Sequence, residues 1–230
     1  MSQQNQVHLQ LAEMVRELSR EHVEDIETLM LEMTRAAVDY VPGADSGGMT
    51  MVESSRAVRT IGATDEVARR IDGIQERHGE GPCLSAAWEL DTVLVDDFAD
   101  DHRWPQFRQA ALAETPVRSS LSFRMFTHRT SMGALNLYST TPGAFDHDAV
   151  ELGSIFATHS AVLWAVSLRD DQFRSALASR DLIGQAKGML MERFGIDAIR
   201  AFDLLTRLSQ ESNTRVIDVA RKVVDTGPTI

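Results

Sequence analysis

Two glycines and a lysine stand close together in the stretch GQAKGMLM, residues 184–191. At helical spacing, Gly184 and Gly188 share one ridge, opposite the apolar side chains of the same stretch. Each glycine costs a helix about 0.8–1 kcal/mol relative to alanine, so the pair indicates that something approaches the backbone closely. Lys187, one of two lysines in the chain, borders the ridge. Such a bare, cation-edged backbone suits a phosphate chain or an unstacked nucleic-acid loop, with a packed helix as the alternative.

The other residues that could carry chemistry form no catalytic set. Cys83 is the only cysteine, which excludes an internal disulfide and any multi-cysteine metal site. Its position after Pro82, at an expected helix start, would suit a redox sensor, and an inert buried thiol is the alternative. The seven histidines show no HxxxH pairing. Since no Ser/His/Asp order, Walker loop or GxGxxG turn is visible either, the sequence predicts a protein that is not an enzyme and holds no metal or cofactor.

A pair of acids, Asp96-Asp97, follows the apolar residues 93–95. Receiver domains place paired acids after a buried strand, but they also need a lysine near the phosphorylated aspartate. No lysine precedes Lys187. We therefore interpret the pair as part of a solvated loop rather than as a phosphorylation site.

The composition is that of a soluble globular protein with unevenly distributed charge. The chain has 230 residues, 43% of them hydrophobic, and a net charge of −11. We see no run of about 18–20 apolar residues and no signal peptide at the N-terminus, so we expect a cytoplasmic protein with no membrane partner. Residues 1–168 carry a net charge of −12 and residues 169–230 a net charge of +1. The acidic total disfavours a nucleic-acid partner, whereas the relatively basic C-terminal segment is compatible with one.

Hydrophobic periodicity predicts an α+β fold for the N-terminal part of the chain. A leader runs as a helix from Val7 to Tyr40, where Pro42-Gly43 ends it. Residues 45–63 follow as a hairpin, and residues 64–66 cap a further helix. The remaining segments are a loop over 78–82, strands over 93–95, 120–126 and 134–138, and a helix over 104–113. Together they predict a mostly antiparallel sheet flanked by helices.

The C-terminal part is predicted to be helical throughout. One helix runs from about residue 146 to 194, until Gly195 ends it. Its length suggests pairing in a homodimer. The alternative is a helix that breaks near Asp170-Asp171 and packs within one chain. Two helices follow, over 196–209 and 215–225, with Asn213-Thr214 as a cap between them. The residues expected to face inward from the first of these are Ala198, Ala201, Phe202, Leu205 and Leu208.

Residues 179–227, SRDLIGQAKGMLMERFGIDAIRAFDLLTRLSQESNTRVIDVARKVVDTG, resemble the ANTAR domain, a three-helix RNA-binding module of bacterial transcription antiterminators. The resemblance includes AKG, LMERFG, AFDLLTRLSQ and DVARKVV. It implies a dimer that binds two adjacent RNA stem-loops and so prevents formation of an overlapping terminator hairpin. The RNA-binding positions carried over by motif are Ala186, Lys187 and Gly188, and charge and exposure add Arg193, Arg215 and Lys222.

A second resemblance covers the N-terminal part, which is similar to GAF domains, the small-molecule sensors of signalling proteins. It is carried by VPGADSGGMTMVE, GEGPCLSAAWELDTVLVDDFADDHRWPQF, SSLSFRMF, MGALNLYST and FDHDAVELGSIFATHSAVLWA. GAF followed by ANTAR is an arrangement familiar in actinobacterial regulators. The implied division is a leader helix over 1–22, a GAF domain over 23–168 and an ANTAR module over 169–230, with the connecting helix over about 146–194. Residues assigned to an effector cavity in the GAF domain are Cys83, Trp88, Trp104 and Phe123.

These resemblances together imply a signal-responsive antiterminator whose GAF domain senses an unidentified small molecule. A reductase of methionine sulfoxide built on this fold would need more than one cysteine, which the chain lacks. The competing hypothesis is a regulatory adaptor whose C-terminal helices dock a protein. Salt separates the two, because phosphate contacts weaken steeply with ionic strength and an apolar docking face does not.

Overall fold

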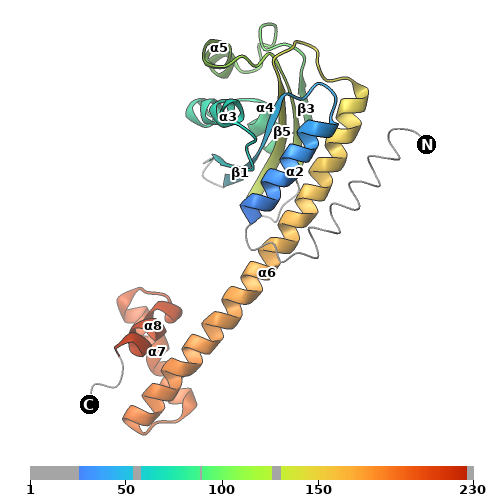
Figure 1. Cartoon of the computed structure of the whole chain (residues 1–230). Helices are drawn as coiled ribbons and strands as arrows, with labels where there is room; N and C mark the ends of the chain where they lie inside the picture. The colour runs from blue at the N-terminus through green and yellow to red at the C-terminus, as the bar shows by residue number, and fades with distance from the viewer. Residues whose placement is uncertain (1–25, 54–57, 89, 126–130, 227–230) are drawn as a thin grey trace, which may run out of the picture. The chain divides into compact units, whose positions relative to one another are not determined.

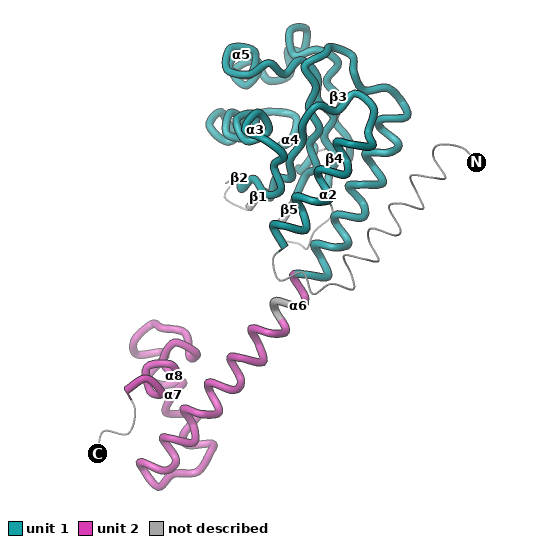
Figure 2. The backbone as a smooth tube through the Cα atoms, viewed as in Figure 1, with its two compact units in different colours: residues 1–167 teal, residues 168–230 magenta. Residues whose placement is uncertain are grey.

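The computed structural model describes residues 26–53, 58–88, 90–125 and 131–226. The chain divides into two compact units, residues 1–167 and residues 168–230 (Figure 2). The predicted leader helix over 1–22, the first part of the helix expected from Val7 and the turn at residue 129 lie outside the described residues.

The first unit is built on a five-stranded antiparallel sheet with the strand order β2-β1-β5-β4-β3. The register pairs Met49 with Leu135 and Leu121 with Leu137, which places these apolar side chains on one face. This sheet confirms the predicted antiparallel arrangement and hairpin. The strands are β1 (Ser46–Glu53), β2 (Val58–Ile61), β3 (Thr92–Val95), β4 (Ser119–Met125) and β5 (Ser131–Ser139).

Helices cover both faces of this sheet. Figure 1 shows α2 and the first part of α6 side by side on one face, where Tyr40 and Phe156 stack with ring centroids 6.3 Å apart. The other face carries α3, α4 and α5, over a core that includes Ile71, Phe107 and Tyr138. The helices are α2 (Ile26–Tyr40), α3 (Glu66–His78), α4 (Pro82–Trp88), α5 (Pro105–Glu114) and α6 (His147–Phe194).

The helix ends follow the local sequence signals. The Asp65 side chain caps α3 by accepting a hydrogen bond from the Ala68 amide at 2.9 Å. Gly79 ends the same helix in the left-handed region at φ 66°, which glycine adopts without a Cβ clash. Pro105 occupies the first turn of α5. Because N–H groups in the first turn have no hydrogen-bond partner within the helix, the missing N–H of proline costs nothing there. The predicted cap at residues 64–66 is confirmed.

The second unit is a three-helix module formed by the second part of α6, α7 (Ala198–Ser212) and α8 (Val216–Asp225). Asp197 caps α7 by accepting from the amides of Ile199 and Arg200. Asn213 ends α7 in the left-handed region at φ 47°, so it closes the preceding helix and does not begin the next one. The core of the module consists of Ala186, Leu190, Ala201, Leu205, Val219 and Ala220.

Three residues of α7 that were predicted to face inward are exposed. Phe202 is 43% exposed and Leu208 is 38% exposed, and Ala198 also faces solvent. Only Ala201 and Leu205 of the predicted inward set are fully buried. The prediction failed because a module of this size has too little interior to enclose every apolar side chain of an amphipathic helix.

One helix among the described residues, α6, is long and apolar enough in an 18-residue window to cross a membrane by length and composition alone. This window was not expected from the sequence, in which no run of about 18–20 apolar residues is visible. Half of it is buried inside the fold, and the core helix of a soluble protein passes the same criterion. The window is therefore weak support for a membrane protein.

Candidate functional site

The ridge formed by Gly184 and Gly188 is open. A Cβ added to either glycine would meet nothing within 4 Å. Both residues lie inside α6, where glycine weakens a helix and no backbone strain requires it. The prediction that the two glycines expose bare backbone is confirmed.

A pocket of about 570 Å³ lies against this ridge, within the second unit. The two charged residues in its lining, Arg180 and Lys187, are both cations, and the Lys187 Nζ lies 5.9 Å from the centroid of the Phe202 ring. Two cations and an aromatic face provide contacts for phosphates and for a base. The complete lining is Ala176, Ser179, Arg180, Ile183, Gly184, Lys187 and Phe202.

The remaining residues assigned to RNA binding lie outside the pocket lining. Ala186 is fully buried in the core of the three-helix module, so its side chain is not available to a ligand. Arg193 is exposed with its guanidinium 5.9 Å from the Phe194 ring. Arg215 pairs with Asp218 at 2.8 Å, and Lys222 is exposed. Sequence analysis missed Arg180, which lies on α6 two turns before Lys187, and Phe202, which the fold brings to Lys187 from α7.

A second group of polar residues is buried in the first unit, between the sheet and helices α3 and α4. Asp72 is fully enclosed, and its carboxylate accepts hydrogen bonds from the Tyr138 hydroxyl at 2.8 Å and the Thr60 hydroxyl at 3.0 Å. Burial raises the pKa of Asp72 to about 7, against the opposing effect of these two hydrogen bonds. Burial and the neighbouring Asp72 carboxylate also raise the pKa of Tyr138 well above its ordinary value. The cluster therefore holds a carboxyl group that changes charge near neutral pH.

Cys83 belongs to the same buried group. Its sulfur lies 2.7 Å from the Thr50 hydroxyl, and its amide donates to the Gln75 side chain at 2.8 Å. Burial, together with the Asp72 charge, raises the pKa of Cys83 to about 12. The thiolate is the reactive form of cysteine, so this thiol is unsuited to redox chemistry.

We expect Cys83 to be inert in the folded protein. At pH 7.5, Ellman's reagent should modify the native chain no faster than the chain unfolds, whereas in denaturant one thiol per chain should react at once. Rapid, complete modification of the native protein would show that the thiol is reachable. A Cys83→Ala variant supplies the blank for the assay.

Several atoms of the buried polar group have no hydrogen-bond partner among the described residues. They include the Ser120 and Ser122 hydroxyls and the Asn136 Oδ1. Ser122 and Asn136 are cross-strand partners, so these atoms share the sheet face that α4 covers. Unsatisfied buried polar atoms are rare, and each one indicates a missing partner such as a ligand or a water molecule. Sequence analysis missed these residues, although serine alternating with Leu121 and Phe123 along β4 was a visible signal.

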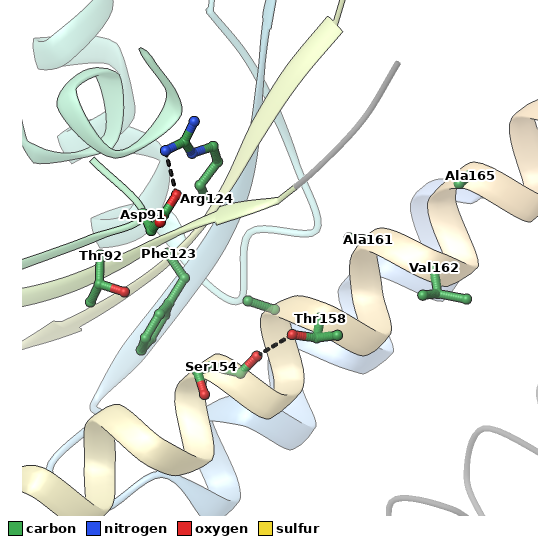
Figure 3. A pocket seen from close by; sticks show the side chains of 10 residues that line it. Asp91, Thr92, Phe123, Arg124, Ser154, Thr158, Ala161, Val162 and Ala165 are labelled. Atoms are coloured by element: carbon green, nitrogen blue, oxygen red, sulfur yellow. Dashed lines mark hydrogen bonds and ion pairs between the residues drawn. The ribbon is translucent and has the colours of Figure 1, made fainter. Parts of the chain in front are cut away.

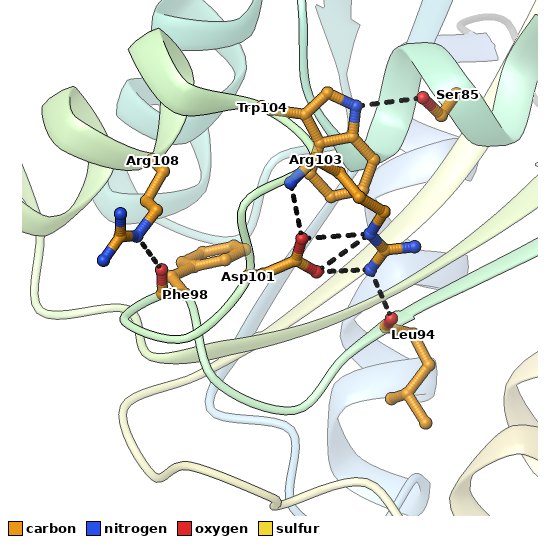
Figure 4. Close-up of polar contacts among 7 residues, drawn as sticks. All are labelled: Ser85, Leu94, Phe98, Asp101, Arg103, Trp104 and Arg108. Atoms are coloured by element: carbon orange, nitrogen blue, oxygen red, sulfur yellow. Dashed lines mark hydrogen bonds and ion pairs between the residues drawn. The ribbon is translucent and has the colours of Figure 1, made fainter.

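Trp88 and Trp104 line a pocket of about 270 Å³ beside α4, together with Glu80. The Trp104 Nε1 donates to the Ser85 hydroxyl at 3.2 Å, and the Arg103 guanidinium lies 4.4 Å from the Trp104 ring (Figure 4). The structure thus brings together two of the residues assigned to an effector cavity.

Phe123 lies elsewhere. It lines a pocket of about 350 Å³ between the β3–β4 edge and α6, where Figure 3 shows its ring directed at the helix. A Cβ on Gly153 of α6 would meet the Phe123 ring at 2.3 Å, so ring and helix are in close contact. The assignment of Phe123 to a common cavity with the tryptophans and Cys83 fails because alternation along β4 turns its side chain to the opposite face.

Asp97, the second of the two acids after β3, has a structural role. Arg118 donates to both carboxylate oxygens of Asp97, at 3.1 and 2.6 Å, and these bonds hold the pKa of Asp97 below its ordinary value. An antiparallel sheet is also not the parallel sheet of a receiver domain. In the part of the chain that the structure describes, no group of three His, Cys, Asp or Glu side chains is arranged to hold a metal ion.

Comparison with known proteins assigns both units. Residues 23–165 match the GAF domain family. The chain belongs to the GAF domain family. Residues 171–224 match the ANTAR domain, so the buried polar group lies in a GAF domain and the glycine ridge in an ANTAR domain. No curated protein matches the chain.

Solved structures support the GAF fold. The GAF domain of an Acinetobacter phosphoenolpyruvate-protein phosphotransferase is 16% identical, with a TM-score of 0.53, covering 74% of this chain and 97% of that one. The photoproduct state of a GAF3 domain from Synechocystis is 10% identical, with a TM-score of 0.52 and coverages of 65% and 99%. Reduced fRMsr of Staphylococcus aureus is 14% identical, with a TM-score of 0.51 and coverages of 67% and 92%. At these identities the likeness shows the fold alone.

The pairing of domains indicates the class of protein. A GAF domain implies signal sensing, and an ANTAR domain implies an RNA-binding antitermination regulator. Both are domains of regulatory proteins.

Proposed function

We propose that this chain is a signal-responsive transcription antiterminator of the actinobacterial GAF–ANTAR type, whose ANTAR domain binds tandem RNA stem-loops and prevents formation of a terminator. The observation that carries the proposal is the open ridge at Gly184 and Gly188 beside a pocket whose charged lining residues are both cations. A phosphate backbone needs close approach and positive charge at the same place. This ridge supplies both.

Local charge supports an RNA partner in spite of the acidic total. The net charge of −11 belongs to the chain as a whole, whereas residues 169–230 carry +1. Phosphate binding depends on nearby cations, because charges separated by more than about 10 Å are largely screened at 0.1 M salt. We assign direct contacts to Lys187 and Gly188, and outlying phosphate contacts to Arg193, Arg215 and Lys222. Ala186 instead keeps α6 packed on the core of the module.

The GAF domain is proposed to bind an effector beneath α4. The orphaned polar atoms of Ser120, Ser122 and Asn136 are suited to such a molecule. Cys83 borders this group, and Trp88 and Trp104 line the adjoining side of α4. An effector acts by favouring one arrangement of the domains, which requires different affinities for the two arrangements.

We further propose a cytoplasmic homodimer that pairs through α6. In the GAF unit, Val162 and Val166 are exposed one turn apart, and in the ANTAR unit Phe173 and Leu177 repeat this spacing. We retain the division into a leader over 1–22, a sensor over 23–168 and an RNA-binding domain over 169–230. The boundary between the two compact units, after residue 167, supports the division between sensor and RNA-binding domain. The chain is proposed not to be an enzyme, and its single, buried cysteine fits that proposal.

Crosslinking and sequencing of bound cellular RNA tests the proposed function. Tandem stem-loops that overlap terminators should be enriched over total RNA, and binding of a recovered tandem stem-loop in vitro should weaken steeply with salt. Recovery of a protein that binds the C-terminal helices independently of salt, with no enriched RNA, would instead identify a docking adaptor.

Replacing Lys187 with alanine should weaken binding of a recovered tandem stem-loop, because a phosphate contact is lost. The slope of log K against log salt should become shallower by about one unit. Filter binding at 50, 100 and 200 mM salt measures both quantities. Lys187→Arg keeps the charge and should retain the slope. An unchanged slope in Lys187→Ala would remove Lys187 from the interface.

A further inference from the structure

Phe202 is an apolar side chain that is not buried in the core of the three-helix module. It lies next to the buried Ala201 on α7, yet it is 43% exposed and lines the pocket at the glycine ridge. Exposing this ring in water is unfavourable unless a partner covers it. Its position in a lined pocket suggests that the partner is a ligand.

This pocket, called the slot below, combines an aromatic side chain with bare backbone. Phe202 is one of its lining residues, and Gly184 contributes backbone with no side chain. Lys187 and Arg180 bring positive charge to the same lining, with the Lys187 Nζ 5.9 Å from the ring centroid. The volume of about 570 Å³ lies within the range of small-molecule sites and is large enough for one nucleotide.

We propose that this slot receives one unpaired base of an RNA loop, which stacks on Phe202 while Lys187 and Arg180 contact the flanking phosphates. The inference rests on the proposed RNA-binding function and adds a base-binding residue to it. Aromatic side chains stack unpaired bases in single-stranded RNA loops. Glycine at position 184 matters because it lines the slot, where a larger side chain would take up space.

The charges of the lining favour RNA over a protein helix. A helix that closed the slot would bury Lys187 and Arg180, and burying a charge without a partner is strongly unfavourable. Phosphates on either side of a stacked base supply such partners. The apolar part of the slot thus matches the base of a nucleotide, and its charged part matches the phosphates.

A double-mutant cycle between protein and RNA tests the proposal. The probe is a tandem stem-loop RNA recovered by crosslinking, intact or with one loop base removed to leave an abasic site. Phe202→Leu should weaken binding of the intact RNA by about 5- to 150-fold, which is the usual effect of losing one stacked base. Phe202→Tyr and Phe202→Trp should bind within about threefold of the unmodified chain, because they keep a stacking face.

The abasic RNA decides whether the ring contacts a base. At one loop position, removal of the base should weaken binding to the unmodified chain and have no further effect on Phe202→Leu. Phe194→Leu is the matched control, since Phe194 is also exposed and has a guanidinium 5.9 Å from its ring, but lies outside the lining. It should show no coupling to the abasic site.

Other results would contradict either the RNA-binding function or the base slot. If the unmodified chain binds no tandem stem-loop, the proposed function fails. If it binds and Phe202→Leu binds equally well, or if the effects are additive at every loop position, the base slot is wrong and the RNA function stands. If Phe202→Leu changes the oligomeric state in sedimentation while RNA affinity stays constant, a protein segment covers the ring.

Discussion

Replacing Gly188 with leucine is expected to stabilise the protein and to weaken its binding to RNA. The added side chain meets open space, and leucine favours a helix over glycine by about 0.5–1 kcal/mol, so the free energy of unfolding should rise by that amount. The same side chain covers the backbone that a phosphate chain must approach. Affinity for a tandem stem-loop should fall at least tenfold, about 1.4 kcal/mol. Denaturant unfolding and filter binding measure the two effects.

Gly73 offers a matched control. It lies inside α3 of the GAF domain and also has nothing within 4 Å of an added Cβ. Gly73→Leu should raise stability to a similar extent and leave RNA affinity unchanged. If Gly188→Leu bound RNA as tightly as the unmodified chain, the glycine ridge could not be the RNA surface.

Replacing Asp72 with asparagine is expected to change how stability depends on pH. The folded-state pKa of Asp72 is about 7 and the ordinary value is 3.8. Between these values the folded chain keeps a proton that the unfolded chain has lost, so stability is lost as pH rises. The contribution of protonated Asp72 to the free energy of unfolding is complete below pH 3.8 and is lost by about pH 7. The loss amounts to up to about 4 kcal/mol. Asp72→Asn carries no charge and should lack this loss.

The quantity to measure is the difference in free energy of unfolding between Asp72→Asn and the unmodified chain. Asparagine keeps an acceptor for Tyr138 and can donate to Thr60, so the two proteins should be similarly stable near pH 4. Above pH 7 the variant should be the more stable, as measured by urea unfolding at pH 4 to 8. A difference that stayed constant over this range would mean that Asp72 titrates as an exposed carboxylate does.

The glycine ridge was predictable because it depends on one helix. Helical geometry alone puts Gly184 and Gly188 on the same side, and nothing in the tertiary structure changes that. Phe202 was not predictable in the same way. Its exposure depends on how much of α7 the other two helices cover, and that is decided by packing among segments distant in the sequence.

In the sheet, too, features that depend on local sequence were predictable and features that depend on pairing between distant segments were not. The segments could be predicted as strands from alternation, and their antiparallel pairing was expected. The buried polar group was missed because Ser122 and Asn136 meet only through the register of β4 and β5. Phe123 was grouped with residues of the opposite face because alternation separates two faces without identifying which face meets which helices.

The shielded sulfur of Cys83 makes this chain convenient for spectroscopy. A cysteine introduced at an exposed position such as Ser175 becomes the one thiol that accepts a spin label or fluorophore, with no need to delete the natural residue. Distances between labels in the proposed dimer can then be followed while candidate effectors are added. Movement of the ANTAR domains can in this way be recorded on protein whose interior is unaltered.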